Sequence, residues 1–255
     1  MPILNTRGDW LKIAIRGILR QTYPNLDLIL CDNGSTNATT LRIEDMTYDD
    51  NDNVSVVYAQ ERGTAYALDE GLKEADQDTA FFNVAGSDDL FSSSWIASRV
   101  EGFKDLPPQI AIVYEDYLLF SSFAFDFRTW GPVHDGNGDI IMRPQTIPIP
   151  LPLYDYRGLL NSNFIPGVAM YRADVYTKIA KSFVFDGYEN VGRHAEDYAH
   201  WLAITDHWDA YHLDTDPALS WTYRVNLKSK YFGDRGNVDK ARELLKRRAW
   251  VRRGL

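Results

Sequence analysis

The chain has 255 residues, of which 45% are hydrophobic and 25% charged, so it suits one large globular domain or two closely packed halves, with a substantial core. Its formal charge of −9 argues against a nucleic-acid partner, because such binders gain affinity from a basic surface. The single cysteine, Cys31, excludes an internal disulfide, and no apolar run reaches the length of a membrane span. The first residues lack the features of a signal peptide. We therefore expect a soluble, cytoplasmic protein.

The first half of the chain alternates strand-like and helix-like segments, the pattern of a parallel sheet covered by helices. The spacing of apolar residues predicts helices over Trp10–Arg20 and Thr64–Ala75. Buried strands are predicted at Leu26–Cys31, Val54–Ala59, Thr79–Ala85 and Ile110–Phe120. The predicted fold class is therefore α/β, with a Rossmann-like, mostly parallel sheet flanked by helices.

The middle of the chain is less regular. Val133–Ile140 has the Gly and Asn residues of a hairpin turn, and the proline-rich stretch Pro144–Leu153 predicts a loop that wraps the surface. A short strand then leads into a helix from about Ala173. A second helix follows, with three core-facing residues: Trp201, Leu202 and Thr205.

The last stretch, Lys240 to Leu255, holds seven Lys or Arg residues against one Glu. It predicts a basic helix on an otherwise acidic protein. A solvated helix, or one docked on the body of the protein, is the default interpretation. A peripheral contact with a membrane surface is the alternative.

Polar residues follow the ends of four predicted strands. The first strand is the short apolar run at the start of the chain, and the other three are Leu26–Cys31, Val54–Ala59 and Thr79–Ala85. The polar residues are Asn5 and Thr6 after the first strand, Asp32, Asn33, Gly34, Ser35 and Thr36 after the second, Gln60, Glu61 and Gly63 after the third, and Ser87, Asp88 and Asp89 after the fourth. In a parallel sheet, ligands bind beyond the carboxyl ends of the strands, so these four ends are expected to meet at one crevice. Each residue type is also an ordinary turn former, so the expectation depends on the predicted topology.

The adjacent carboxylates Asp88 and Asp89 have two interpretations. Carboxylates accept hydrogen bonds from the free amides of a helix's first turn, so the pair could cap the next helix. They also suit a divalent cation that neutralises a phosphate, because Mg²⁺ and Mn²⁺ prefer oxygen ligands. Taken alone, so short an acidic motif favours capping.

Four stretches carry a more specific resemblance. “GDWLKIAIRGILRQTYPNLDLILCDNGSTN”, “GTAYALDEGLKEA”, “AGSDDLF” and “GVAMYRADVYTKIAKSFVFDGYENVGRHAEDYAHWL” have the order and spacing of the GT-A inverting glycosyltransferases of family two. The chain most resembles the small soluble members that use a nucleotide-sugar donor, including the bacterial spore-coat type. The resemblance implies a single GT-A domain, residues 1–255. Its expected parts are a nucleotide-sugar-binding half (1–108), a smaller acceptor-binding half (109–228) and the basic helix (229–255).

The resemblance also implies roles for individual residues. Asp89 with Asp88 would hold Mn²⁺ or Mg²⁺, which stabilises the departing diphosphate. Asp197, with Glu196 as second choice, would take the proton of the acceptor hydroxyl as it attacks from the opposite face. An ordinary alternative for Asp197 is a first-turn acid favoured by the helix dipole. The implied nucleotide contacts are Asn5, Thr6, Asp32, Asn33, Gly34, Gly63 and Asp88.

Three features depart from the family pattern. The first strand, in “MPILNTRGDW”, is short, and Asn226 stands where many relatives carry a metal-binding His. Asn33 replaces the second Asp of the base-reading motif, and its amide suits the edge of uracil or of thymine. We therefore expect a UDP-sugar donor, with UDP-glucose or UDP-galactose first and a dTDP-sugar as the alternative. The acceptor is expected to be a glycan or another hydroxyl compound.

Other functions compete with this hexose transfer. A nucleotidyltransferase or an oxidoreductase would need a Gly-rich phosphate loop, which the sequence lacks. A non-catalytic nucleotide-sugar or glycan binder stays open. The spacing of four histidines disfavours a zinc site, and Trp130 is a candidate acceptor contact. These histidines are His194, His200, His207 and His212.

Overall fold

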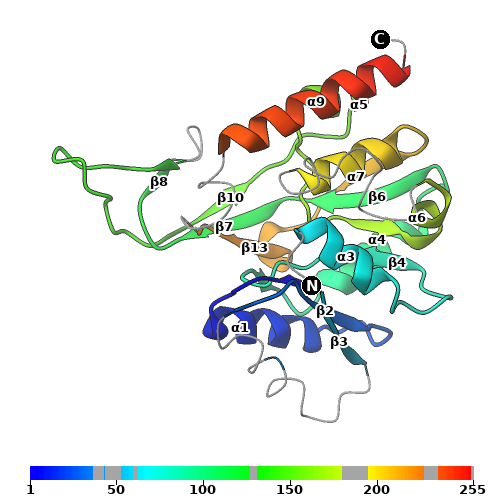
Figure 1. Ribbon diagram of the computed structural model, residues 1–255, viewed down its shortest axis with the longest axis horizontal. Helices are drawn as coiled ribbons and strands as arrows, with labels where there is room; N and C mark the ends of the chain where they lie inside the picture. The colour runs from blue at the N-terminus through cyan, green and yellow to red at the C-terminus, as the bar shows by residue number, and fades with distance from the viewer. Residues whose placement is uncertain are drawn as a thin grey trace.

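The computed structural model combines small β-sheets with flanking helices and a long arm at one end (Figure 1). It describes residues 1–36, 43, 53–59, 63–126, 131–179, 195–226 and 235–253. Among these residues, no helix is both long and apolar enough to cross a membrane.

The first sheet is entirely parallel and has the order β1-β2-β3. Helix α3 packs on β1 and β2, and Gly71 lets it approach the buried thiol of Cys31, because a side chain at 71 would overlap that sulfur. The elements of this region are β1 (Pro2–Ile3), α1 (Gly8–Leu19), β2 (Leu28–Asp32), β3 (Val54–Tyr58) and α3 (Thr64–Leu72).

The second sheet has the order β12-β6-β11-β4. Strand β11 runs antiparallel to β4 and β6, while β12 runs parallel to β6, so the carboxyl ends of β4, β6 and β12 share one edge. No ladder joins β4 to β1 within the part of the chain that the structure describes. The bounds are β4 (Phe81–Asn83), β6 (Ile110–Glu115), β11 (Met170–Arg172) and β12 (Asp209–Leu213).

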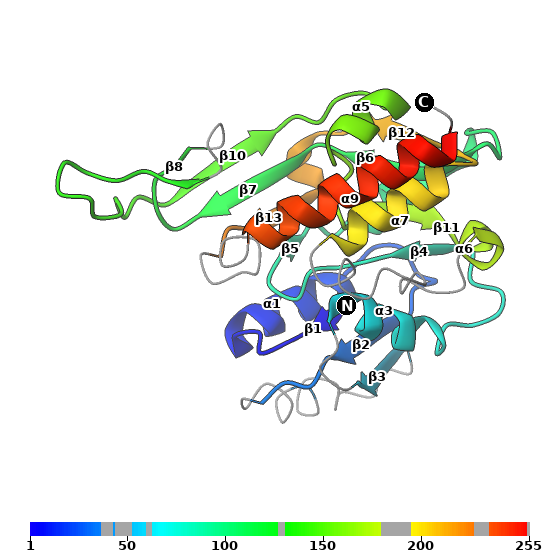
Figure 2. The same ribbon diagram turned by 45° about the horizontal axis from the view of Figure 1, so that its top comes forward.

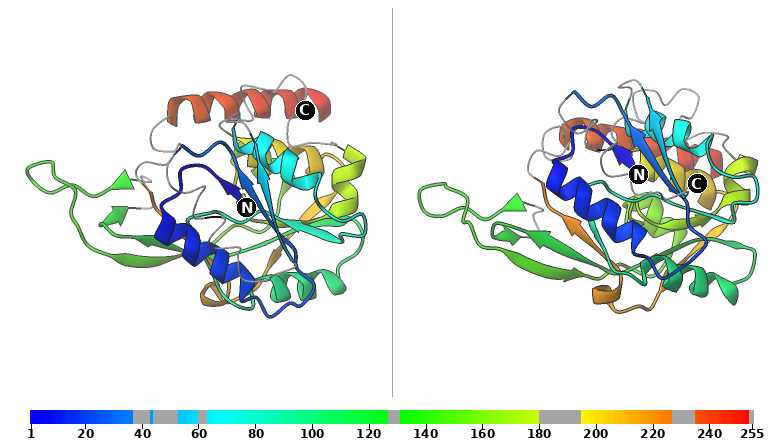
Figure 3. Two further views of the ribbon diagram at one scale, coloured as in Figure 1. Left: turned by 60° about the horizontal axis from the view of Figure 1, so that its bottom comes forward. Right: turned by 90° about the horizontal axis from the view of Figure 1, so that it is seen from below.

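The third sheet, of order β10-β7-β13-β5, lies beside the second and leads into the arm. The arm carries the short pair β8 and β9 and extends away from the body in each view (Figure 3). The bounds are β5 (Leu90–Phe91), β7 (Tyr117–Ser121), β8 (Phe125–Asp126), β9 (Gly131–Pro132), β10 (Gln145–Ile149) and β13 (Trp221–Arg224).

The remaining helices cover the second sheet. Helix α7 is buried from Tyr198 to Thr205, and α9 runs alongside it, also contacting α5 (Figure 2). The helices are α4 (Trp95–Lys104), α5 (Tyr156–Asn161), α6 (Ala173–Ile179), α7 (Glu196–Thr205), the 3₁₀ turn η1 (Pro217–Leu219) and α9 (Arg235–Arg253).

The α/β class and the helices and strands predicted before residue 100 are confirmed, with ends that shift by at most three residues. The hairpin at Val133–Ile140 is also confirmed by the bridge between His134 and Ile140 and by the φ of 87° at Gly138. The three residues predicted to face the core from the later helix are all buried: Trp201, Leu202 and Thr205.

Two predictions are wrong. The strand predicted over Ile110–Phe120 breaks at Asp116 into β6 and β7, which lie in different sheets. The Asp116 carboxylate accepts a hydrogen bond from Leu151 N at 2.8 Å and lies 2.7 Å from His212 Nε2. Asp116 therefore binds two other segments at the point where the chain passes from one sheet to the next. The loop predicted over Pro144–Leu153 contains β10, which pairs with β7. Its one proline, Pro148, is tolerated because β10 is an edge strand.

His200 makes the core sensitive to acid. It is 1% exposed and packs against Tyr171, and burial lowers its pKa to about 3. The folded chain therefore keeps His200 neutral between about pH 6.5 and 3, while the unfolded chain protonates it. We predict that the free energy of unfolding falls by about 1.4 kcal/mol per pH unit across this window through His200 alone. We expect the free energy of unfolding, measured with denaturant from pH 7 to 4, to change more steeply with pH in wild type than in His200→Leu. The difference in slope should correspond to one bound proton. Equal slopes would contradict the prediction, and the exposed His207→Gln variant is the control.

Candidate active site

The structure brings three of the four predicted strand ends together. Asn5 follows β1 with a φ of 51°, its backbone N–H donates to Ser35 Oγ at 2.9 Å, and its Oδ1 accepts from Thr36 N at 2.8 Å. The hydroxyl of Thr6 lies 2.7 Å from that of Ser87. The end of β1 is thereby joined to the end of β2 on one side and to the turn after β4 on the other. A non-Gly residue at positive φ costs energy, and such positions cluster at functional sites.

The third strand end is described only in part, because Gln60 and Glu61 lie outside the described residues. Gly63, with a φ of 109°, is the N-cap of α3 and is buried. A φ in this range favours glycine, so Gly63 lets the chain turn into the helix without strain.

Asp32 and Asn33 build the turn that follows β2. Both are buried, and Asp32 Oδ1 accepts a hydrogen bond from Ser35 N at 3.1 Å. Asn33 N donates to Ile3 O at 2.8 Å, and Gly34 then reverses the chain with a φ of 80°. The motif therefore shapes the edge of the crevice, and its contact with a nucleotide stays a prediction.

Asp88 and Asp89 do not cap a helix. Strand β5 separates them from α4. The N-cap residue of α4 is Ser94, and no side chain forms a capping hydrogen bond there. Asp89 Oδ1 instead accepts from Arg224 N at 3.0 Å, and Arg224 Nε donates to Asp88 O at 2.9 Å. The pair is thus fastened to the end of β13, and the capping interpretation is wrong.

The two carboxylates repel each other in a poorly solvated site. Asp89 is 4% exposed, and burial, followed by the neighbouring charge of Asp88, raises its pKa to about 8. Burial also raises the pKa of Asp88, which is half-buried, while Arg224 and a hydrogen bond from Asn226 act in the opposite direction. A cation placed between the carboxylates would offset this repulsion.

Asn226 reaches this pair, since its side chain hydrogen-bonds the Asp88 carboxyl group. The residue in the position of the family's His is therefore at the acidic site. Carboxylate and amide oxygens are a donor set that fits a hard divalent cation. The described part of the chain has no group of three or more His, Cys, Asp or Glu residues placed to hold a metal. Such a cation would need water or substrate phosphates to complete its shell.

Asp197 lies in the first turn of α7, beside Glu196. Its Oδ2 accepts from Asn163 Nδ2 at 3.0 Å, and its Oδ1 accepts from Tyr198 N at 2.7 Å. Burial raises the pKa of Asp197, whereas these hydrogen bonds and the charge of Arg242 on α9 lower it. The result is an oriented, partly exposed carboxylate with a raised pKa, which suits a general base.

The segment before β11 places Asp197 near the carboxyl end of β4. Val168 O accepts from Asn83 Nδ2 at 3.0 Å, and Asn83 is the last residue of β4. The preceding residue, Gly167, lies against Asp197, where an added Cβ would stand 3.5 Å from Asp197 Cβ. The first turn of α7 therefore adjoins the strand that leads to Asp88 and Asp89.

Sequence reasoning missed a buried ion pair behind this edge. Arg99 Nε donates to both carboxylate oxygens of Glu115, at 2.9 and 2.8 Å. Arg99 is 0% and Glu115 1% exposed. The helical spacing offered a signal, because Arg99 falls on the same face as Trp95, Ile96 and Phe103 of α4. An Arg on an apolar helix face needs a buried partner.

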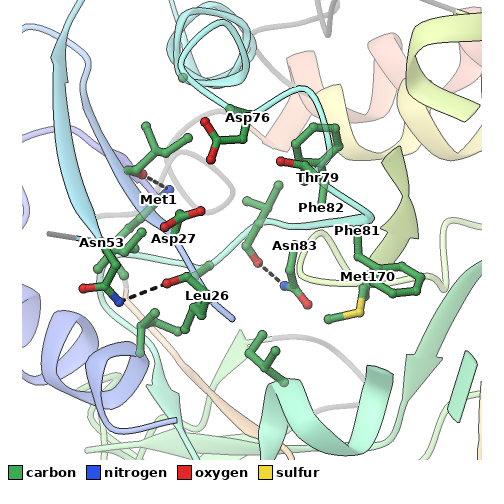
Figure 4. Close-up of a pocket in the computed structure, with 18 of the residues that line it drawn as sticks. Met1, Leu26, Asp27, Asn53, Asp76, Thr79, Phe81, Phe82, Asn83 and Met170 are labelled. Carbon is green, nitrogen blue, oxygen red and sulfur yellow. Dashed lines mark hydrogen bonds between the residues drawn. The ribbon is translucent and has the colours of Figure 1, made fainter. Parts of the chain in front are cut away.

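A separate cavity lies away from these residues. A hollow of about 760 Å³ opens between β2 and β4, where β1 forms no ladder with β4, and Met1, Asn53 and Met170 line it (Figure 4). The Met1 amine donates to Ile29 O at 2.7 Å within it. None of the predicted site residues lines this cavity. We therefore place the candidate site at the strand ends.

The four histidines and Trp130 named in the sequence analysis do not gather at this site in the part of the chain that the structure describes. His200 lies in the core, His207 is exposed, and His212 pairs with Asp116. His194 and Trp130 lie outside the described residues.

The Glycosyl transferase family 2 profile matches residues 1–179. The chain belongs to this family. An uncharacterized glycosyltransferase of Rickettsia conorii is 28% identical over 120 residues, which are 47% of this chain and 19% of that protein. Glycosyltransferase GlyG of Streptococcus pneumoniae is 28% identical over 113 residues, which are 44% of this chain and 36% of GlyG. This family 2 chain thus spans well under two thirds of these relatives.

Solved structures agree on the GT-A fold. The mannosyltransferase PcManGT of Pyrobaculum calidifontis, in complex with GDP-Man and Mn²⁺, superposes with a TM-score of 0.59 at 17% identity. The match covers 89% of this family 2 chain and 56% of PcManGT. S. aureus TarS 1–349 in complex with UDP gives a TM-score of 0.56 at 14% identity, covering 96% and 64%. The resemblance to GT-A enzymes of family two is confirmed.

Gly86 tests the geometry of the acidic pair. A Cβ at this position would collide with Asp89 Oδ2, so Gly86→Ala should displace the Asp89 carboxylate and cost about 1–3 kcal/mol of stability. We expect the Mn²⁺-dependent rise in melting temperature to disappear in this variant. Gly136→Ala is the matched control, because an added Cβ there meets nothing within 4 Å. An unchanged Mn²⁺ response in Gly86→Ala would show that the position of Asp89 is immaterial.

Proposed function

We propose that the chain is a metal-dependent, inverting transferase that moves a hexose from a UDP-sugar to a hydroxyl acceptor. The observation that carries the proposal is the adjacent pair of half-buried Asp88 and buried Asp89, joined through the turn at Ser87 to the end of β1. Asp197 adjoins the same edge of the sheet through Gly167. The nucleotide and Mn²⁺ in the complexes of PcManGT and TarS support a nucleotide-sugar donor and a divalent cation.

The acidic pair supplies the proposed metal ligands, Mn²⁺ or Mg²⁺ being the expected ion. Asp88 presents the more exposed carboxylate and Asn226 is bonded to it, while Asp89 is anchored by Arg224 N. When bound, a divalent cation supplies charge stabilisation to the departing diphosphate. Asp89 would lose its proton as the ion binds, because a bound cation favours the ionised carboxylate, whereas burial and the charge of Asp88 favour the protonated form.

Asp197 is the proposed general base. As the acceptor oxygen attacks the anomeric carbon, its hydroxyl proton moves to Asp197, the bond to the diphosphate breaks, and UDP leaves from the opposite face. This geometry inverts the anomeric centre. Asn163 and Tyr198 N hold one carboxylate oxygen each, which keeps Asp197 in a single orientation.

Donor selection falls to the turns after β1 and β2. We propose that Asn33, with Asp32, binds the nucleobase of the donor. The remainder of the nucleotide is proposed to contact Asn5, Thr6, Gly34, Gly63 and Asp88. The donor is UDP-glucose or UDP-galactose, with a dTDP-sugar second, because uracil and thymine present the same edge to Asn33. The acceptor is a glycan or another hydroxyl compound, and the proposed location is the cytoplasm.

A second candidate is a non-catalytic nucleotide-sugar binder. It is favoured by Asn226 in the position of a metal-binding His and by an Asp89 that holds its proton at neutral pH. Donor hydrolysis measured with and without Mn²⁺ separates the two. Hydrolysis that requires Mn²⁺ supports the transferase, and binding without hydrolysis supports the second candidate.

The acidic pair generates a prediction with opposite effects on stability and binding. Asp89→Asn keeps an acceptor for Arg224 N and removes the repulsion with Asp88, so the metal-free protein should be at least as stable as wild type. Asp89→Ala leaves that buried N–H unpaired and should cost about 1–3 kcal/mol. Both variants, and Asp88→Asn, should lose Mn²⁺-dependent UDP binding in calorimetry. Retention of that binding by Asp88→Asn and Asp89→Asn would remove the pair from the metal site.

Asp197→Asn separates a catalyst from a binder. The substitution keeps the shape of the side chain, so metal and donor affinity should persist while transfer falls on the order of a hundredfold or more. A residue that merely favours the helix dipole would cost roughly a kcal/mol or less and leave turnover intact. Asp174→Asn is the matched control, because Asp174 is an exposed acid in the first turn of α6. Transfer at the parent rate in Asp197→Asn would make Glu196 the next candidate.

A further inference from the structure

Helix α9 has two faces of different chemistry. Its inner face packs on α5 and α7 through a row of small and aliphatic residues: Val238, Ala241, Leu245 and Ala249. Its outer face carries a row at spacings of four, three and four residues: Lys240, Leu244, Arg247 and Val251. These spacings place the row on one side of the helix, so cations and apolar side chains alternate along it.

Three apolar side chains of α9 are exposed, two in the outer row and one on its flank. Val251 is 80% exposed, Leu244 39%, and Trp250, on the flank, 41%. Scattered exposed apolar residues are normal on a protein surface. Three of them among basic side chains on one helix are instead typical of helices that lie in a membrane interface.

The charge of α9 opposes that of the rest of the chain. Residues 235–253 contain eight Lys or Arg and two acidic residues, a formal charge of +6, whereas the whole chain carries −9. Glu243 is paired with Lys246 at 2.9 Å, and this hydrogen bond and the neighbouring charges of Lys246 and Arg247 lower its pKa, so one acidic side chain lies beside the outer row. An anionic surface would attract α9 and repel the acidic body, which orients the molecule.

We propose that the outer face of α9 binds the surface of an anionic lipid bilayer, with Lys240, Arg247 and Arg248 at the headgroups and Leu244, Trp250 and Val251 among the upper acyl carbons. The helix is about 28 Å long and runs along the outside of the molecule (Figure 1), so it lies flat on the lipid. Its inner face meets α7, so the first turn with Asp197 lies on the membrane side of the body. This binding does not depend on the proposed transfer reaction.

The test is sedimentation of the full chain with phosphatidylcholine vesicles that contain or lack phosphatidylserine. We expect binding to the anionic vesicles only, weakened by salt. Lys240→Gln with Arg247→Gln should weaken it about 25-fold, at about fivefold per charge. Val251→Ser should weaken it about tenfold. The matched control is Lys73→Gln with Lys104→Gln, two exposed lysines at the carboxyl ends of α3 and α4, which changes the net charge equally and should retain binding.

Three results would overturn the proposal. One is a folded wild-type chain that does not sediment with phosphatidylserine vesicles at low salt. Another is an equal loss in the Lys73 and Lys104 control, which would mean that net charge alone matters. The third is binding to polyanions such as RNA without binding to vesicles, which would assign the basic face to a different partner. Melting curves of every variant check that the exposed substitutions leave the fold intact.

Discussion

The ion pair between Arg99 and Glu115 is the constraint on which the site depends. Two charges in an apolar core cost several kcal/mol each unless hydrogen bonds satisfy them. Here Trp95 Nε1 and Ser220 Oγ donate to Glu115, at 3.1 and 2.6 Å. Arg99 Nη1 donates to Asn83 Oδ1 at 2.7 Å and to the carbonyl that precedes β11 at 2.5 Å. Removal of any one partner would leave a buried charge without its hydrogen bond, which costs stability. The network therefore holds α4 and the ends of β4 and β6 at fixed positions.

Both halves of the candidate site are attached to this network. From Asn83 it continues through Val168 to Gly167, which lies against Asp197. From Ser220 it passes into β13, whose last residue, Arg224, binds the turn of Asp88 and Asp89. Carboxylates with raised pKa values destabilise the metal-free fold at neutral pH. The buried ion pair joins β4, β6 and the start of β13 through Asn83, Glu115 and Ser220, and so holds the strand that leads to the acidic turn in a fixed place.

Sequence patterns were sufficient where a feature is local and failed where it depends on distant segments. Helices with one buried face follow from the periodicity of apolar residues. The meeting of strand ends follows from the topology of a parallel sheet, and this prediction holds for Asn5, Thr6 and Ser87. The break at Asp116 depends on Leu151 and His212. Strand β5, which separates the acidic pair from α4, exists through pairing with β13, in which Phe91 lies opposite Trp221, 130 residues further along the chain. Strand β10 accommodates Pro148 because tertiary packing leaves it at an edge.

Asp89 and Asp197 are the same residue type, raised in pKa by the same cause, yet their neighbours assign them different chemistry. Beside Asp89 stands another carboxylate, which raises its pKa further, so the site holds a proton until a stronger positive charge replaces it. Beside Asp197 stands Arg242, whose charge acts against the burial that raises the pKa of Asp197. A carboxylate pair that awaits a cation fits a metal ligand, and a single oriented carboxylate beside a cation fits a base. Because Arg242 belongs to α9, the helix that we assign to the lipid surface also lowers the pKa of the proposed base.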